Sequence, residues 1–258
     1  MVWSEEPRKL SHRLQIMADK VRPGESIADV GTDHGYLPLY LYEKGISPRV
    51  VLTDISEASL AKAKSSFGAG QFGNDVSFRV GDGLDVLGSG EVDVVVIAGM
   101  GGLLIRDILS ADLEKTRSYK RLVLQPRTAA GPLRKWLLEY DFVFLSEDVV
   151  EEGDFLPEIM TVAPKGEDLA EGIRETLSEP DVPDIHFDVP IWMMKASGPV
   201  GDHLDRRVQM YENTLTGLKK AKAPDERAID YAEYSIDYLS KMRELWSLLE
   251  ERREEEEE

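Results

Sequence analysis

The sequence predicts an α/β fold in which a mostly parallel, seven-stranded sheet is followed by an α-helical hairpin. Three observations predict it. Short apolar runs alternate with longer stretches of helical spacing, Gly-rich turns follow several of these runs, and the spacing becomes purely helical after Gly201. Parallel strands need crossover connections of about a dozen residues or more. Most gaps between the first five runs are long enough to carry a helix.

Seven apolar runs rich in strand-forming residues are interpreted as the strands. They cover residues 27–30, 50–53, 76–80, 92–98, 122–125, 142–149 and 157–162. The last two runs are separated only by Glu151-Glu152-Gly153-Asp154 and a few neighbours, a connection short enough for a hairpin. The final strand is therefore predicted to run antiparallel to its neighbour, and residues 1–163 are predicted to form one domain.

The C-terminal part divides into three predicted segments. Residues 164–200 are acidic and interrupted by prolines, which indicates an irregular linker with only Val189–Met194 packed. Residues 201–252 carry apolar residues every three or four positions in two runs, broken at Pro224-Asp225. This spacing predicts an antiparallel coiled-coil hairpin. The Glu-rich tail, residues 253–258, is predicted to be disordered.

The bulk composition narrows the functional classes. The chain has no Cys, which excludes disulfides, Cys-ligated zinc and a Cys nucleophile. Its His residues show no metal-ligand spacing, so no metal is expected. No apolar run approaches the roughly 18 residues of a membrane span, and the first residues do not resemble a secretory signal. We therefore expect a cytoplasmic protein without a membrane partner; the oligomeric state stays open, with a monomer favoured.

The net charge of −18 is unevenly distributed. Residues 145–188 hold 2 Lys and Arg against 14 Asp and Glu, whereas residues 1–144 are almost neutral. Between Lys115 and Lys135 there are seven cations and no acidic residue. This stretch is either a phosphate-binding patch or a solvated loop and helix face. The overall charge therefore does not exclude an RNA partner.

The first two predicted strands end in candidate ligand-binding residues. Asp29 lies at the end of the first strand, and the following Gly31 and Gly35 can let the backbone approach a ligand. Asp54 closes the second strand, where a carboxylate could bind the hydroxyls of a ribose. Each of these could instead be an ordinary turn residue. Ligands of open α/β sheets bind outside the carboxyl ends of the strands, which favours a ligand site.

The third and fourth predicted strands end in two further signals. Asp82 and Gly83 follow the third strand, and Asp82 could contact an adenine amine. Ala98-Gly99-Met100-Gly101-Gly102 closes the fourth, where a substrate would be expected. A dinucleotide site would instead require Gly-x-Gly-x-x-Gly. Here Asp33 and His34 occupy that loop, and a carboxylate would repel pyrophosphate but suit the sulfonium of S-adenosylmethionine (AdoMet). His34 could also be a packed helix-start residue without a catalytic role.

These motifs together resemble a known family. The acidic residue and glycines after the first strand resemble the signature of class I AdoMet-dependent methyltransferases. The bacterial tRNA adenine-N1-methyltransferase family that modifies position 22 of tRNA is similar over nearly the whole chain. The segments that carry this resemblance are Leu10-Ser11-His12-Arg13-Leu14, Ala28 to Pro38, Val96 to Gly102, Leu122-Val123-Leu124-Gln125-Pro126 and Leu133 to Leu137. Arg127 and Gly35 depart from it, since Asn and Ala are usual there.

The resemblance implies a Rossmann-like class I methyltransferase fold, AdoMet as cofactor and tRNA as partner. It also implies roles for individual residues. Asp29, Gly31, Asp33, His34, Gly35 and Tyr36 would form the cofactor floor, Asp54 would hold the ribose, Asp82 and Gly83 the adenine, and Gly99, Met100 and Gly101 would border the methyl group and the target base.

The predicted activity is methyl transfer to N1 of an adenine in tRNA. N1 methylation leaves a cationic adenine, so a nearby carboxylate would stabilise the developing charge; Asp33 is the candidate catalytic residue. Five cations on the outer positions of the hairpin are expected to contact RNA: Arg206, Arg207, Lys219, Lys220 and Lys222. Two alternatives remain open, namely a class I methyltransferase acting on a small molecule and a non-catalytic AdoMet-binding module whose hairpin binds protein.

Overall fold

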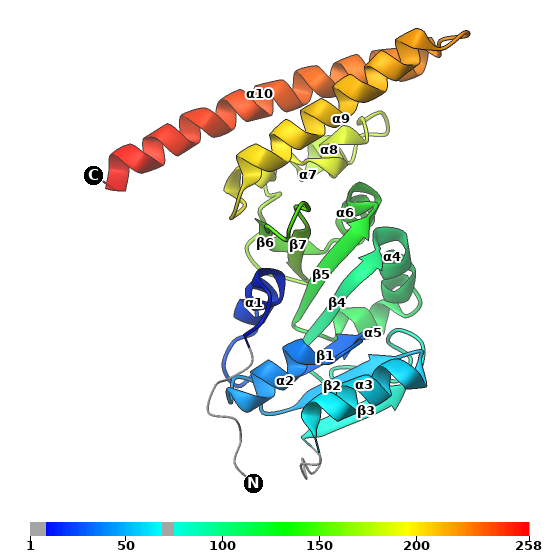
Figure 1. Ribbon diagram of the computed structural model, residues 1–258, viewed down its shortest axis with the longest axis vertical. Helices are drawn as coiled ribbons and strands as arrows, with labels where there is room; N and C mark the ends of the chain where they lie inside the picture. The colour runs from blue at the N-terminus through cyan, green and yellow to red at the C-terminus, as the bar shows by residue number, and fades with distance from the viewer. Residues whose placement is uncertain (1–8, 69–74, 258) are drawn as a thin grey trace.

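The computed structural model describes residues 9–68 and 75–257 and contains the predicted seven-stranded sheet (Figure 1). Residues 1–8 of the first predicted domain and Glu258 of the predicted tail lie outside the described residues. The strands are β1 (Ile27–Val30), β2 (Val50–Asp54), β3 (Val76–Val80), β4 (Val94–Gly101), β5 (Arg121–Thr128), β6 (Val143–Val149) and β7 (Glu158–Ala163). All seven overlap the apolar runs that predicted them.

The strand order is β3-β2-β1-β4-β5-β7-β6. Neighbours among the first five strands pair in parallel, whereas β7 lies between β5 and β6 and is antiparallel to both. The predicted antiparallel final strand is therefore confirmed. The chain adds β2 and β3 on one side of β1 and then crosses to β4 on the other. This reversal between β1 and β4 is the position at which open α/β sheets bind ligands.

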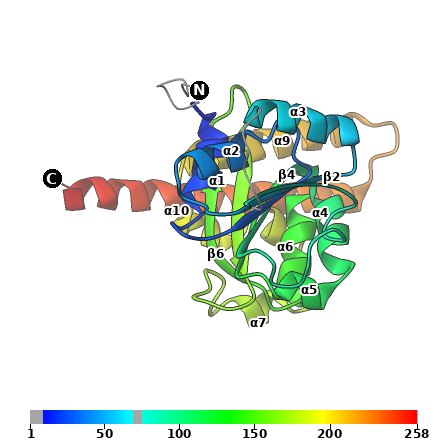
Figure 2. The same ribbon diagram turned by 90° about the horizontal axis from the view of Figure 1, so that it is seen from below.

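Helices cover both faces of the sheet (Figure 2). One face carries α1 (His12–Asp19), α2 (Tyr36–Glu43) and α3 (Glu57–Phe67), and the other carries α4 (Gly102–Ser110), α5 (Leu113–Arg117) and α6 (Ala130–Glu139). Successive strand residues point to opposite faces. In β1, Ile27 packs under the first group of helices and Ala28 packs under the second. Two buried cores result, one on each face, which explains why the central strand β4 begins with a continuous apolar run.

The acidic segment after β7 is more ordered than predicted. It contains α7 (Arg174–Leu177), α8 (Ile185–Asp188) and the 3₁₀ helix η1 (Ile191–Lys195). Phe187 and Trp192 belong to the core that also contains α6. Met193 and Met194 instead pack against the C-terminal helices. The buried residues of this segment are interspersed among its acidic ones. Some of them pack against the sheet domain and others against the hairpin, so the segment joins the two by apolar contacts.

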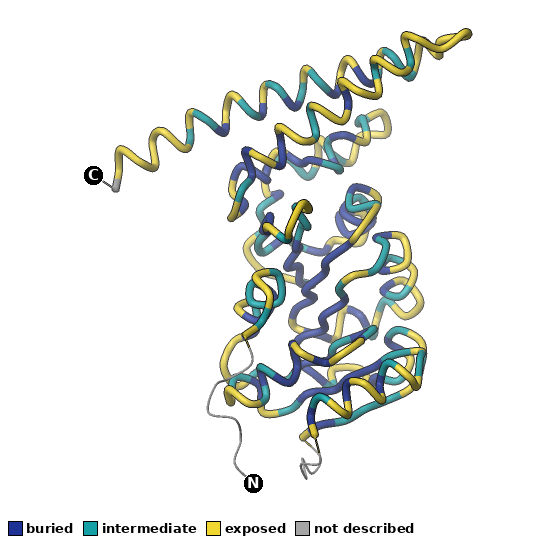
Figure 3. Tube along the Cα trace, in the orientation of Figure 1, coloured by how far each residue is buried: buried dark blue, intermediate teal, exposed yellow. Residues whose placement is uncertain are grey.

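The C-terminal hairpin consists of α9 (Val200–Lys220) and α10 (Glu226–Glu257), which run antiparallel (Figure 1). Leu204 and Tyr211 of α9 pack in one cluster with Leu239, Met242 and Trp246 of α10. The tip of the hairpin and the last turns of α10 are exposed (Figure 3). Within the described ranges, no helix combines the length and apolarity that crossing a bilayer requires.

The prediction of disorder after residue 252 is wrong for the described part of the tail, because α10 continues to Glu257. Glu and Arg are good helix formers, so the repeated residues extend the helix. Arg253 also ties the end of the helix to the rest of the molecule. It donates to the Met194 carbonyl at 3.3 Å, and its guanidinium lies 5.1 Å from the Trp246 ring centre.

Candidate functional site

The parallel pairing brings four strand ends to one edge of the sheet. Val30 pairs with Thr53 of β2 and with Ile97 of β4. Asp54 pairs with Val80, the last residue of β3. The loop after β1, Asp54, the turn after β3 and the end of β4 therefore lie along the same edge, which we call the carboxyl edge. The sequence prediction placed its candidate residues on these four segments.

Two carboxylates on the carboxyl edge form no ion pair with a Lys, Arg or His among the described residues. Asp54 accepts a hydrogen bond from the Ser56 amide at 2.7 Å and is half-buried. Burial raises the pKa of Asp29 to about 6, against the opposing effect of the Thr32 hydroxyl, and the negative charge of Asp54 adds to the rise. Carboxylates without a cationic partner suit a ligand that brings hydroxyl donors or positive charge.

Asp33 and His34 lie in the loop after β1, but Asp33 has a partner that the sequence did not reveal. Its Oδ1 lies 2.9 Å from Lys62 Nζ of α3, and its Oδ2 lies 3.3 Å from His34 Nε2. The Lys62 hydrogen bond is the main reason that the pKa of Asp33 is lowered. The His34 ring stacks on Tyr36 with the ring centres 5.1 Å apart. Because Asp33 and Lys62 are both exposed, their ion pair is weak and exchangeable.

The glycines of the two loops have different functions. A Cβ on Gly31 would lie 2.0 Å from Met100 Cε, so this glycine permits the loops after β1 and β4 to meet. Gly99 has a φ of +75° and open space where its Cβ would be. A Cβ on Gly35, by contrast, would lie 2.8 Å from Leu52 Cδ2. Gly35 is therefore required for packing, whereas Gly99 leaves open space beside the end of β4.

In the turn after β3, the two residues predicted to bind a ligand also differ: one is needed for packing and the other is exposed. Asp82 is exposed on the carboxyl edge, and its carbonyl accepts the Asp85 amide at 3.0 Å to close the turn. A Cβ on Gly83 would lie 2.8 Å from Ile108 Cγ2 of α4. Gly83 thus permits packing against α4, and Asp82 is the residue of this turn that could contact a ligand.

The sequence prediction missed a polar chain that holds the end of β4. Gln125, which is buried at the end of β5, accepts the Gly99 amide through Oε1 at 3.2 Å. The same oxygen accepts from Arg13 Nη1 of α1 at 3.1 Å. Arg13 also donates to Glu152 of the β6–β7 connection at 2.8 Å. Gln125 and Arg13 were visible as motif residues, but nothing in the sequence placed them beside Gly99.

A cleft of about 220 Å³ lies where the carboxyl edge meets α9. Its walls come from the end of β5, the start of α6, residues 156–158 and the first half of α9. A larger groove of about 880 Å³ lies at the opposite edge, around the start of β5 and the end of β7. The strand-end candidates line neither space, so their chemistry and not cavity size identifies the site. Among the described residues, no group of three or more His, Asp or Glu is arranged to hold a metal ion.

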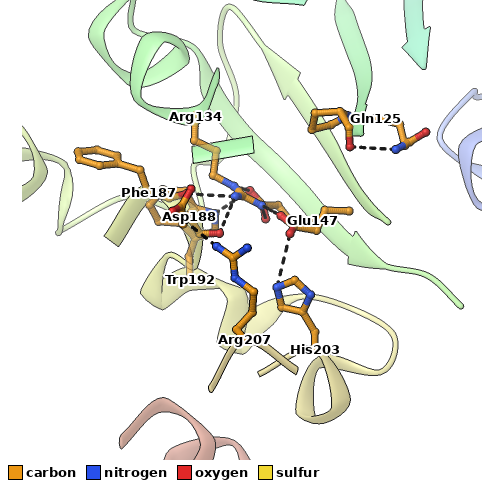
Figure 4. A network of polar contacts seen from close by, with 10 residues as sticks. Gln125, Arg134, Glu147, Phe187, Asp188, Trp192, His203 and Arg207 are labelled. Carbon is orange, nitrogen blue, oxygen red and sulfur yellow. Dashed lines mark hydrogen bonds and ion pairs between the residues drawn. The ribbon is translucent and has the colours of Figure 1, made fainter. Parts of the chain in front are cut away.

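A buried network of charges joins α6, β6 and β7 to the segment before α9 (Figure 4). Arg134 of α6 is fully buried and makes two hydrogen bonds of 2.9 Å to Glu147 of β6. It also contacts Glu158 of β7. Trp192 Nε1 donates to Glu147 at 3.1 Å. Arg134 therefore neutralises two carboxylates that the fold has removed from water.

Two residues of α9 join this network. His203 Nε2 lies 3.4 Å from Glu158 Oε1, and an Arg207 nitrogen lies 3.5 Å from Asp188 Oδ2. Burial disfavours ionisation of Glu158, yet the charge of the fully buried Arg134 holds its pKa below the usual range. The network thus anchors the hairpin to the sheet domain.

These contacts correct two predictions about basic surfaces. Arg207 is half-buried against Asp188 and is therefore not an outward-facing cation, whereas Arg206 is exposed and donates to the Asp154 carbonyl. Lys219 pairs with Glu233 at 2.7 Å. Lys220 and Lys222 are exposed near the tip. The predicted cluster between Lys115 and Lys135 is not one patch, because its members are distributed over several elements and Arg121 and Arg134 are buried in ion pairs.

The carboxyl edge fits AdoMet by its own chemistry. Thr53 Oγ1 is buried there without a hydrogen-bond partner among the described residues, and the Thr32 hydroxyl is buried beside Asp29. Asp29 and Asp54 add two acceptors that lack cations, and Gly99 leaves open backbone. Hydroxyl groups and a positive charge on one ligand would satisfy these groups together.

Comparison with known proteins points to the same cofactor class. Residues 10–160 match a family described as a methyltransferase domain. The tRNA (adenine(22)-N(1))-methyltransferase of Bacillus subtilis (strain 168) is 35% identical over 162 residues, which cover 63% of this chain and 68% of the relative. A putative tRNA methyltransferase of Mycoplasma pneumoniae is 32% identical over 157 residues, covering 59% of this chain and 71% of the relative.

Solved structures extend the similarity to the C-terminal helices. The m1A22 tRNA methyltransferase of B. subtilis is 27% identical, with a TM-score of 0.77 and coverage of 91% of this chain and 99% of that chain. A putative tRNA (m1A22) methyltransferase of Streptococcus pneumoniae, in complex with S-adenosyl-L-methionine, is 25% identical, with a TM-score of 0.74 and coverage of 91% and 100%. The matched domain, the sequence identity and the shared fold together show that this chain belongs to the tRNA (adenine-N1)-methyltransferase family.

Proposed function

We propose that this protein transfers a methyl group from AdoMet to N1 of an adenine in tRNA, at position 22 as in the relatives whose names state that position. One observation carries the proposal. The chain has the fold of these relatives, and its carboxyl edge presents two carboxylates, Asp29 and Asp54, that form no ion pair with any described residue, beside the open backbone of Gly99. The S. pneumoniae relative, whose chain is covered completely, binds AdoMet.

The residues of the carboxyl edge divide the cofactor contacts among them. When bound, AdoMet supplies an electrophilic methyl group on a sulfonium. Asp54 would accept hydrogen bonds from the ribose hydroxyls, and Asp82 would contact the adenine. Asp29 and the backbone of Gly31 would lie under the charged part of the ligand, with His34 and Tyr36 covering the loop side. Gly99 and Met100 would border the transferred group, because they end β4 beside Gly31.

The protein contributes to the reaction mainly by orientation. Methylation at N1 needs no covalent intermediate, so alignment of the adenine with the methyl group supplies much of the rate. The Arg13–Gln125–Gly99 chain holds the end of β4 where the adenine must approach. Asp33 would stabilise the positive charge that develops on the adenine. Lys62 would have to release Asp33 for this role, since the two are paired in the free protein.

The hairpin supplies a second contact with tRNA in this proposal. Lys220 and Lys222 are exposed near its tip, far along the hairpin from the anchoring network. Phosphate contacts of this kind give affinity without sequence specificity. With tRNA as substrate, we expect the activity to be cytoplasmic.

A tritium-transfer assay tests the proposal. The protein is incubated with AdoMet labelled on the methyl group and with either bulk unmodified tRNA or a panel of small acceptors. We expect label in the tRNA fraction alone. Label only in small acceptors would favour a small-molecule methyltransferase. Retained AdoMet affinity with no label in any acceptor would favour a non-catalytic binding module.

A further inference from the structure

Phe155, in the connection between β6 and β7, is one of the most exposed large apolar residues of the described chain. Its exposed fraction is 76%, so its ring contributes almost nothing to the core. Single exposed apolar side chains are common on protein surfaces. The exposure alone therefore does not indicate a function. The evidence for one comes from the conformation and the position of the loop that carries Phe155.

The loop that carries Phe155 is held in one conformation. The Glu152 amide donates to the Phe155 carbonyl at 3.0 Å, and the Phe155 amide donates to the Glu152 carbonyl at 3.1 Å. Gly153 allows this tight turn with a φ of +60°. Arg13 of α1 binds the Glu152 side chain, and Arg206 of α9 donates to the Asp154 carbonyl. Two separate helices thus fix the turn, which presents the ring at a defined place.

The loop that carries Phe155 lies at the carboxyl edge of the sheet. Because β7 runs antiparallel to β5, it begins where β5 ends, and the loop before it lies beside Gln125. The contacts from Glu152 to Arg13, from Arg13 to Gln125 and from Gln125 to Gly99 connect the loop directly to the end of β4. Leu156 and Pro157, which follow the ring in sequence, line the 220 Å³ cleft.

The cleft beside the loop offers a cation. Its two acidic residues already have partners, since Glu158 contacts Arg134 and Asp188 lies 3.5 Å from Arg207. Arg127, which lines the cleft at the end of β5, is exposed. An exposed ring next in sequence to the cleft residue Leu156, together with an exposed guanidinium lining that cleft, matches one nucleotide of an unpaired strand, because the base can stack and the phosphate can pair with the guanidinium.

We propose that Phe155 is a stacking platform for an unpaired tRNA base next to the methylated adenine, with Arg127 binding the adjoining phosphate. This inference rests on the proposed tRNA methyltransferase function. A base that is to be methylated must first leave its stack. A ring that receives the neighbouring base replaces part of the stacking that is lost, so Phe155 is a positioning residue for the substrate and takes no part in cofactor binding.

The test compares Phe155→Leu with Phe155→Trp in the full-length protein. Leucine keeps an apolar side chain but has no π face, whereas tryptophan stacks on any base. We expect Phe155→Leu to raise the Kd for unmodified tRNA and the KM for tRNA by about 5- to 100-fold. Phe155→Trp should stay within about twofold of the wild type for the same reason. The Kd for AdoMet and the Tm should not change in either variant.

Tyr140→Leu is the matched control, because it removes an exposed aromatic ring from the C-terminal end of α6, away from the carboxyl edge. It should leave tRNA affinity unchanged. Arg127→Ala should lower the dependence of tRNA affinity on salt by about 0.7 in the logarithmic slope, as loss of one phosphate contact on a single strand predicts.

Three results would overturn the inference. They are equal tRNA affinity of Phe155→Leu and the wild type, equal loss in the Leu and Trp variants, and a change in oligomeric state with unchanged tRNA affinity. The last would assign the ring to contact between copies of the chain. If the wild type methylates no tRNA, the proposed function fails, and the binding measurements still decide whether Phe155 stacks on RNA.

Discussion

The carboxyl edge of the sheet and the network below the hairpin both collect acidic side chains, but they neutralise them in different ways. Glu147 and Glu158 of the network contact the fully buried Arg134. Asp29 and Asp54 of the carboxyl edge form no ion pair within the described chain, and Asp33 holds only exposed contacts, with Lys62 and with His34. Acidic groups whose partners lie inside the protein serve the fold. Those without partners leave their hydrogen-bonding capacity to a ligand.

The largest effect is expected from breaking the network. Arg134→Met should lower the free energy of unfolding by about 3–5 kcal/mol, because Glu147 and Glu158 would be left buried without their cation. Chemical denaturation at pH 7 measures the loss. Arg106→Met is the control, since Arg106 forms an exposed pair with Asp107 and its removal should cost less than about 1 kcal/mol. Equal losses in the two variants would remove the distinction between the regions.

At the carboxyl edge, by contrast, we expect a substitution to weaken cofactor binding and to leave stability unchanged. Asp54→Asn keeps the hydrogen bond to the Ser56 amide but removes the charge. We expect AdoMet affinity to fall about 10- to 100-fold, the range for hydrogen bonds to a charged group. Titration calorimetry measures it, with exposed Asp85→Asn as the control. An unchanged Kd with a lowered Tm would make Asp54 a structural residue.

Asp29 of the carboxyl edge should make the free energy of unfolding depend on pH. The pKa of Asp29 is raised to about 6, so between about pH 4 and pH 6 the folded state binds more protons than the unfolded state. Its contribution therefore lowers the stability of the cofactor-free protein as the pH rises through this window. Asp29→Asn should match the wild type only below about pH 4 and exceed it by about 1–3 kcal/mol at pH 7.5. Denaturation curves at both pH values measure the difference, and an equal gain at both would contradict the pKa shift.

The smallest effect is expected at the hairpin tip, far from both regions. The double variant Lys220→Glu and Lys222→Glu should weaken tRNA binding severalfold and flatten its salt dependence, because two exposed cations are lost. Filter binding at several salt concentrations measures both quantities. Lys165→Glu, which reverses an exposed cation at the opposite edge of the sheet, should change neither. Unchanged affinity in the tip variant would remove the hairpin from the RNA-binding surface.

The contrast between the carboxyl edge and the buried network also explains which features could be predicted from the sequence. The strands and the reversed β7 followed from local patterns, because apolar runs and a four-residue turn lie within a few positions of each other. The carboxyl edge followed as well, since parallel pairing brings all strand ends together. The roles of Gly35 and Gly83 did not follow, because only the fold places Leu52 and Ile108 against them.

The network could not be predicted from local patterns. Arg134 and its partners Glu147 and Glu158 lie on three different elements, and His203 reaches Glu158 from a fourth. In the sequence Arg134 is one of seven cations in a stretch without acidic residues, which suggested a surface patch. Lys62 was missed for the same reason, because its contact with Asp33 joins α3 to the loop after β1. Charge counts along a chain do not show which charges the fold will pair.

The most direct test of the account is mass mapping of the methylated nucleosides in tRNA after incubation with the protein and AdoMet. The account predicts 1-methyladenosine at position 22, its absence when that adenine is replaced, and strongly reduced formation with Asp54→Asn at limiting AdoMet. A methyl group on another atom or another base would contradict the assigned chemistry. Undiminished methylation by Asp54→Asn at limiting AdoMet would contradict the assignment of the carboxyl edge as the cofactor site.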